Sequence, residues 1–122
     1  MTEKFTLEKF GEFEFRTKIT FLDSEQIENI VAKNFGGRVE LTTVKMKLDE
    51  LRSKLDKVTL DNLIDLGEYN DHKARLNRHY KHATLKVILT KTPSGFNLNY
   101  LDLEELDLLY SAYEVALKPF RG

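Results

Sequence analysis

The first clear pattern in the chain is a strict alternation of apolar and polar residues between positions 12 and 21. On one side of an extended backbone lie Phe13, Phe15, Thr17, Ile19 and Phe21. A period of two predicts a β-strand over residues 12–21 that is buried on one face. Because that face carries three phenylalanines and an isoleucine, it needs a covering layer of helices or a partner.

A second group of apolar residues precedes this strand. Phe5, Leu7 and Phe10 interrupt a segment that otherwise carries many charges. They predict either a second strand or a surface patch used in assembly, which leaves self-association open.

The period becomes helical after residue 22. Asp23 followed by Gln26 resembles a capping box and predicts a helix from about Ser24 to Asn34, ended by the pair Gly36-Gly37. Apolar residues then recur every three or four positions from residue 41 to Val58, as in an amphipathic helix. The β-branched residues between positions 39 and 44 leave open a short strand at the start of this segment.

Two further helices are expected in the second half of the chain. A short apolar segment that begins at Leu60 ends at Gly67, so residues 56–65 either prolong the preceding helix or form their own turn. Asp71 is expected to cap a longer helix that ends before the turn at Pro93 and Gly95. Asn99 or Asp102 opens the last helix, in which the residues expected to face inward are Leu103, Leu106, Leu109, Tyr110, Tyr113 and Leu117.

These patterns predict one mainly α domain over residues 1–122. Four to five helices from about 23 to 118 pack on a short N-terminal β-strand or hairpin, and a composition that is 41% hydrophobic is sufficient for a core. No apolar run approaches the roughly 20 residues that span a bilayer. The charged first ten residues lack a signal-peptide core, so we expect a soluble cytoplasmic protein with no membrane contact.

Charge is balanced overall but unevenly placed. The net charge is −1, which argues against a dedicated nucleic-acid binder. The segment 72–91 contains no acid, whereas residues 99–117 contain no Lys or Arg. Two helices of opposite sign joined by a short turn are expected to pack antiparallel and neutralise each other, and a basic surface that faces a partner is the alternative. The cations of the first segment are Lys73, Arg75, Arg78, Lys81, Lys86 and Lys91; the acids of the second are Asp102, Glu104, Glu105, Asp107 and Glu114.

The basic segment supplies the candidate partner-binding residues. These are Lys73, Arg75, Arg78, Lys81 and His82. Basic side chains on one helix can also follow a nucleic-acid backbone. A small nucleic-acid-binding regulatory module that uses helix 72–91 is therefore the alternative function, against which the net charge and the lack of a nucleic-acid motif both weigh.

Neither a metal site nor a catalytic site is expected. His72, His79 and His82 share one sector of a helix, but cations surround them and no carboxylate lies between residues 72 and 91, so we interpret them as surface histidines. The chain has no cysteine, which excludes thiol chemistry. It also lacks a nucleophile elbow, a phosphate loop and a dinucleotide fingerprint, so we expect neither an enzyme nor a cofactor.

A resemblance adds to this interpretation. It rests on the order and spacing of Phe13-Glu14-Phe15-Arg16-Thr17, the helix at residues 23–30, the Gly36-Gly37 break, the helix end at residues 83–89, the turn at residues 92–96, and Leu109-Tyr110-Ser111-Ala112-Tyr113 before Phe120. In these features the chain resembles the tail assembly chaperones of long-tailed bacteriophages, the tape-measure chaperone family. The resemblance implies a mainly helical, non-catalytic protein of the bacterial host cytoplasm. Such a protein coats the tape measure protein and helps to recruit tail tube protein, and a longer frameshifted product is also implied.

Overall fold

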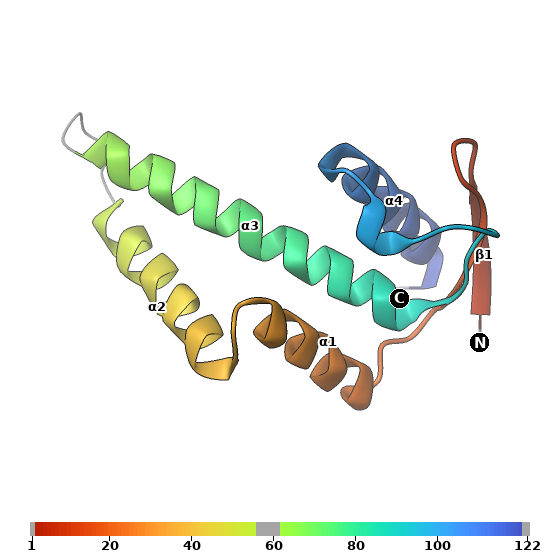
Figure 1. The fold of residues 1–122 in the computed structure, drawn as a ribbon, viewed down its shortest axis with the longest axis horizontal. Helices are drawn as coiled ribbons and strands as arrows, with labels where there is room; N and C mark the ends of the chain where they lie inside the picture. The colour runs from red at the N-terminus through yellow and green to blue at the C-terminus, as the bar shows by residue number, and fades with distance from the viewer. Residues whose placement is uncertain (1, 56–61, 121–122) are drawn as a thin grey trace.

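The computed structural model describes residues 2–55 and 62–120, and a long central helix organises them (Figure 1). Two shorter helices follow one another along one side of it, and the last helix and a small sheet lie near its C-terminal end. The predicted mainly α fold on a short N-terminal hairpin is confirmed. In chain order the elements are β1 (Thr2–Leu7), β2 (Gly11–Arg16), α1 (Phe21–Asn34), α2 (Arg38–Lys54), α3 (Leu63–Ile88), β3 (Leu89–Lys91), the 3-10 turn η2 (Leu98–Tyr100), α4 (Leu103–Leu117) and the 3-10 turn η3 (Lys118–Phe120).

The sheet is antiparallel, in the order β1-β2-β3. Phe5 lies opposite Phe13 in the register of β1 and β2, and the two rings stack with their centroids 5.2 Å apart. Of the two interpretations of the apolar residues that precede β2, the second strand is therefore the one found. The three-residue β3 was not predicted, because it is too short to show a period of two.

The predicted strand over residues 12–21 is too long at its C-terminal end. β2 ends at Arg16, and the two later apolar residues of the pattern are exposed, Ile19 by 48% and Phe21 by 78%. Only Phe13 and Phe15 are buried as expected. The physical reason is that a helix begins immediately after Thr20 and turns the chain away from the sheet.

The capping box of α1 lies earlier than predicted. The Thr20 hydroxyl accepts a hydrogen bond from the Asp23 N–H at 3.1 Å, and the Asp23 carboxylate accepts one from the Thr20 N–H at 2.9 Å. Asp23 is thus the third helical residue rather than the cap, and Gln26 has no part in the box. The same carboxylate receives both guanidinium nitrogens of Arg16, at 2.6 and 2.8 Å, which ties the end of β2 to the start of α1.

The glycine break and the helix after it agree with the sequence pattern. Gly36 and Gly37 have φ values of 95° and 134°, which residues with a side chain rarely adopt. The stretch from Val39 to Val44, for which the sequence allows either a strand or a helix, is helical, and Leu41 is buried. Val58 and Leu60 lie outside the described residues.

α3 is longer than predicted at its N-terminal end. It begins at Leu63 and continues without interruption through Gly67 and Asp71, so Gly67 ends no segment and Asp71 is not a cap. At 26 residues the helix is about 39 Å long. A glycine costs a helix only about 1 kcal/mol. The packing of this long helix against α1 and α2 stabilises it by more than that.

α3 contributes to two apolar clusters. Ala83 packs with Ile27, Val31 and Leu41 of the first two helices. The second cluster joins α3 to the sheet and α4, and its buried members are Phe13, Phe15, Leu85, Ile88, Leu106, Leu109, Tyr113 and Leu117.

Asp102, one of the two predicted caps, is the N-cap of α4. The Asp102 carboxylate accepts a hydrogen bond from the Glu105 N–H at 2.8 Å, and the Glu105 side chain accepts one from the Asp102 N–H at 3.0 Å. Leu106, Leu109, Tyr113 and Leu117 face inward as expected, but Leu103, which was expected to do so, is 55% exposed.

Candidate functional site

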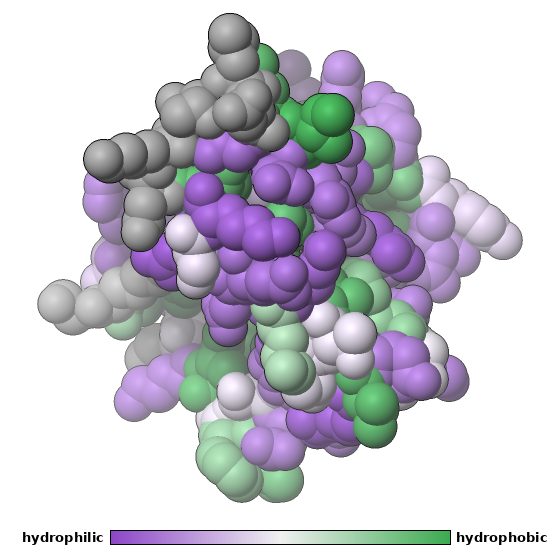
Figure 2. All heavy atoms as spheres, turned by 90° about the vertical axis from the view of Figure 1, so that its left-hand side faces the viewer, coloured by the Kyte–Doolittle hydropathy of each residue, from purple (hydrophilic) through white to green (hydrophobic). Residues whose placement is uncertain are grey.

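The five candidate residues all lie on α3, but Lys73 is separated from the others. It lines a pocket of about 390 Å³ between α2 and α3, where its Nζ lies 5.7 Å from the centre of the Tyr69 ring. Figure 2 shows the end of the molecule formed by the α2–α3 hairpin. This face is mainly hydrophilic, with hydrophobic side chains in separate spots rather than in one continuous patch.

Three of the other candidates meet in a second pocket, between α3 and the start of α4. It has a volume of about 270 Å³, and we call it the basic pocket. Its lining residues are Arg75, Arg78, His79, His82, Leu103 and Leu106. None of these six is acidic. The exposure of Leu103 is thereby explained, because this side chain forms one wall of the pocket.

The C-terminal end of α1 supports one side of the basic pocket. The Arg75 guanidinium carbon lies 4.6 Å from the centre of the Phe35 ring, within range of a cation–π interaction. The His79 ring meets the edge of the same phenylalanine, with centroids 4.8 Å apart, and the Asn34 amide nitrogen is 3.5 Å from His79 Nδ1. Phe35 therefore restrains two basic side chains at once.

The two histidines of the pocket experience different surroundings. Burial lowers the pKa of His79, and the nearby charges of Arg75, His82 and Arg78 lower it further. His82 Nε2 lies 2.9 Å from the Asn99 side-chain oxygen. The pocket thus disfavours an additional proton on His79, as expected where positive charge is in excess.

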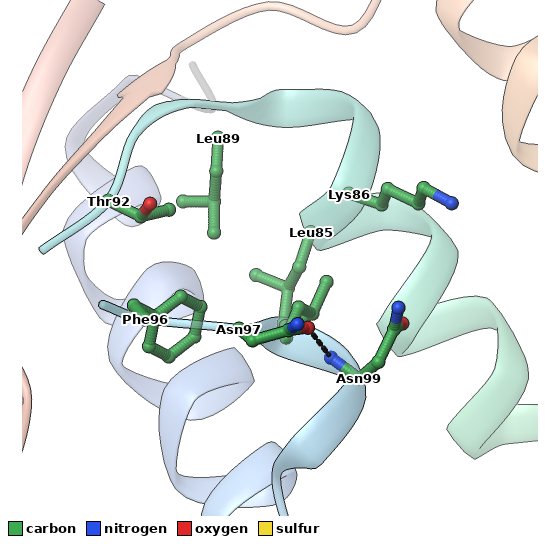
Figure 3. A pocket seen from close by; sticks show the side chains of 8 residues that line it. Leu85, Lys86, Leu89, Thr92, Phe96, Asn97 and Asn99 are labelled. Carbon is green, nitrogen blue, oxygen red and sulfur yellow. Dashed lines mark hydrogen bonds between the residues drawn. The ribbon is translucent and has the colours of Figure 1, made fainter. Parts of the chain in front are cut away.

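Asn99 lies between the basic pocket and a neighbouring pocket of about 270 Å³, shown in Figure 3. In this neighbour Leu85, Leu89 and Phe96 lie around an apolar interior. The Asn97 side-chain oxygen accepts a hydrogen bond from the Asn99 N–H at 2.9 Å, which fixes the backbone at the rim. The remaining lining residues are Lys86, Thr92 and Leu98.

The fifth candidate, Lys81, is paired within the molecule. Its Nζ lies 3.1 Å from Asp107 of α4 and 5.6 Å from the centre of the Tyr110 ring. Across residues 62–120, this is the one ion pair between the six cations of segment 72–91 and the acids of segment 99–117. The expected mutual neutralisation is therefore largely absent, and Arg75 and Arg78 form no salt bridge with any described residue.

The orientation expected of the two charged helices is also wrong. α3 and α4 run in roughly the same direction, because β3 and the residues after it carry the chain back before α4 begins (Figure 1). Arg78 accordingly lies near Leu103 at the start of α4, and Lys81 near Asp107 further along it.

The three histidines have different neighbours. His72 Nε2 lies 3.7 Å from Glu68, a carboxylate one turn earlier on α3 and outside segment 72–91. His79 contacts Phe35, and His82 contacts Asn99. Among the described residues, no three His, Cys, Asp or Glu side chains lie close enough together to hold a metal ion.

Sequence patterns had linked the basic residues to one another but not to Phe35, Asn99 or the two leucines. These four come from the end of α1, from η2 and from the first turns of α4. No local period could have indicated that the two leucines line the basic pocket and that Phe35 and Asn99 contact its basic side chains. No described helix is both long enough and apolar enough to cross a lipid bilayer.

Comparison of the chain with protein-family models, curated proteins and solved structures finds no match.

Proposed function

We propose that this chain is a non-catalytic tail assembly chaperone of a long-tailed bacteriophage, which binds the tape measure protein and assists assembly of the tail tube protein. The sequence resemblance described above supports this proposal. The mainly helical fold on an N-terminal hairpin is compatible with it.

The observation that carries the proposal is the composition of the basic pocket. Arg75 and Arg78 lie beside Leu103 and Leu106, without an acid in the lining. Arginine is enriched at protein interfaces, where apolar surface supplies binding energy and charge supplies orientation. A protein segment can offer both kinds of group together.

The placement of the cations favours a protein over a nucleic acid. A nucleic-acid backbone is held by cations that follow its phosphates. Here Lys73 belongs to a different pocket from Arg75 and Arg78, and Lys81 is paired with Asp107. The five candidates on α3 therefore do not form one continuous row of cations.

Copurification tests the proposal. The chain is coexpressed with a tape measure fragment, as wild type and as the double variant Arg75→Glu, Arg78→Glu. We expect the wild type to retain the fragment and the double variant to lose it. The free energy of unfolding should change by no more than about 1–2 kcal/mol, because exposed charges contribute little to stability.

A matched control carries the same change in charge outside the basic pocket. Lys86→Glu with Lys91→Glu reverses two exposed cations of the same basic segment and should retain the fragment. Failure of the wild type to copurify contradicts the proposed function. Retention by the arginine double variant contradicts the binding face. Retention on DNA or RNA that falls steeply with salt, and is lost in that variant, supports the regulatory module instead.

A further inference from the structure

The basic pocket combines fixed cations with an apolar wall. The Arg75 guanidinium lies over the Phe35 ring, with its central carbon 4.6 Å from the ring centre. Arg78 is half-buried and, like Arg75, forms no salt bridge in the part of the chain that the structure describes. Opposite them, Leu106 is buried and Leu103 is 55% exposed.

The charge in this pocket is not balanced from any side. α3 contributes two arginines and two histidines, α4 contributes two leucines, and no lining residue is an acid. Two of the acids next to these leucines in sequence are paired elsewhere, Glu105 with Lys9 at 2.8 Å and Asp107 with Lys81 at 3.1 Å. Glu104, which follows Leu103, is exposed and does not line the pocket. Burial lowers the pKa of His79 most, and the charges of Arg75, His82 and Arg78 lower it further. An anionic group would therefore be stabilised here.

We propose that the basic pocket binds an acidic side chain of a protein partner together with a neighbouring aliphatic side chain. Arg75 and Arg78 donate to the carboxylate, and the aliphatic group packs on Leu103 and Leu106. Guanidinium groups suit planar carboxylates because they donate two parallel hydrogen bonds. A nucleic-acid phosphate would satisfy the arginines but would bring no group to cover Leu103.

This inference names the chemistry that the partner presents, and it rests on the proposed function only for the partner's identity. The expected recognition sequence is an amphipathic segment in which Asp or Glu lies next to Leu, Ile or Val on the same face. On a helix such pairs are three or four residues apart.

Labelled peptides test the pairing directly. The probe is a helical peptide with Glu and Leu repeated on one face. A second peptide replaces each Glu of that face by Gln, and a third replaces each Leu by Ser. Fluorescence anisotropy gives Kd for each peptide with the wild-type chain. We expect each replacement to weaken binding at least about tenfold, which corresponds to about 1.4 kcal/mol.

Variants of the chain locate the binding in the pocket. Arg75→Gln with Arg78→Gln should bind the Glu peptide at least about tenfold more weakly but the Gln peptide no more weakly than wild type does, since the lost contact is already missing there. Leu103→Ser should lose affinity for peptides that carry Leu. Lys86→Gln with Lys91→Gln removes the same charge from two exposed cations outside the basic pocket and should bind within about twofold of wild type. Melting curves verify that every variant is folded.

Several outcomes overturn the inference. Equal affinity for the Glu and Gln peptides would show that the pocket does not recognise the carboxylate. An equal loss of affinity in the lysine control would show that the effect comes from net charge alone. A single-stranded oligonucleotide that competes fully with the peptide would make phosphate the ligand. Concentration-dependent self-association in sedimentation experiments, abolished by the arginine variant, would make a second copy of this chain the occupant.

The peptide and copurification experiments separate the two proposals. If the peptides obey these rules and the tape measure fragment does not copurify, the pocket chemistry stands and the proposed function fails. If the fragment copurifies equally well with Arg75→Gln, Arg78→Gln, the function stands and this pocket is not its site.

Discussion

Gly67 is a glycine in the interior of α3, where it carries the conformational cost of glycine without an evident need for it. A Cβ built on it meets no atom within 4 Å, and its backbone is helical. Gly67→Ala should therefore raise the free energy of unfolding by about 0.5–1 kcal/mol. Urea denaturation measures this change.

Gly95 is the matched control, because a Cβ there also meets no atom within 4 Å but φ is +77°. Gly95→Ala should lower stability, since an alanine is strained in that region. If Gly67→Ala destabilises the chain as Gly95→Ala does, the helix does not continue through residue 67 as described.

Phe15 and Phe21 were predicted on the same face of one strand, and the structure separates them. Phe15 is fully buried, with its ring centroid 5.4 Å from that of Tyr113, whereas Phe21 is 78% exposed. Phe15→Ala should cost about 3–5 kcal/mol. Phe21→Ala should change stability by less than about 0.5 kcal/mol. A melting curve unchanged by Phe15→Ala would show that this ring is exposed.

At the scale of elements, the junction of β2 and α1 depends on one ionised carboxylate. Hydrogen bonds from the Arg16 guanidinium, and then from the Thr20 backbone, lower the pKa of Asp23 from its ordinary value of 3.8 to about 2. The ionised form therefore stabilises the fold above about pH 4, and this contribution is lost as the pH falls toward 2.

Asp23→Asn tests this dependence on pH. The variant should be less stable than wild type at pH 6, because the ion pair with Arg16 and the full capping box are gone. The difference between the two proteins should shrink between pH 4 and pH 2, as followed by urea denaturation at each pH. A difference that stays constant over this range would exclude the titration of Asp23 as its cause.

At the scale of the whole molecule, α3 contributes to both apolar clusters, and these clusters have few contacts with each other apart from this helix. Ala83 packs toward α1 and α2, whereas Leu85 and Ile88 pack toward the sheet and α4. The hydrogen bonds of Tyr80 with Glu28, at 2.9 Å, link α3 to α1, and the bond from Arg16 to the Val87 carbonyl, at 3.3 Å, links α3 to β2. This helix therefore sets the geometry of the basic pocket relative to the sheet.

The whole molecule is expected to fold without metal. His72, His79 and His82 each contact a different neighbour, and cations surround the latter two. Addition of a chelator should leave the melting temperature unchanged. A lowered melting temperature, or stoichiometric zinc in the purified protein, would contradict this prediction and direct attention to His79 and His82.

Local signals in the sequence predicted that the helices exist, although α1 and α3 begin earlier than expected. The period of the apolar residues predicted the helices, because side-chain spacing along a helix is a local property. Gly36-Gly37 predicted the break, because the backbone there needs positive φ. The cluster of basic residues on one helix was likewise visible in the sequence.

Tertiary structure decided what depends on residues far apart in the chain. The end of β2 is an exception, because the contacts that set it join residues only three and seven apart, Thr20 with Asp23 and Arg16 with Asp23. The alternation that continues to residue 21 concealed this local signal. The short β3 and the return of the chain before α4 made the last two helices run the same way, which left Arg75 and Arg78 beside leucines instead of acids. Charge counts along a sequence give the groups that are available, but pairing requires distances of a few ångströms, and only the path of the chain determines those.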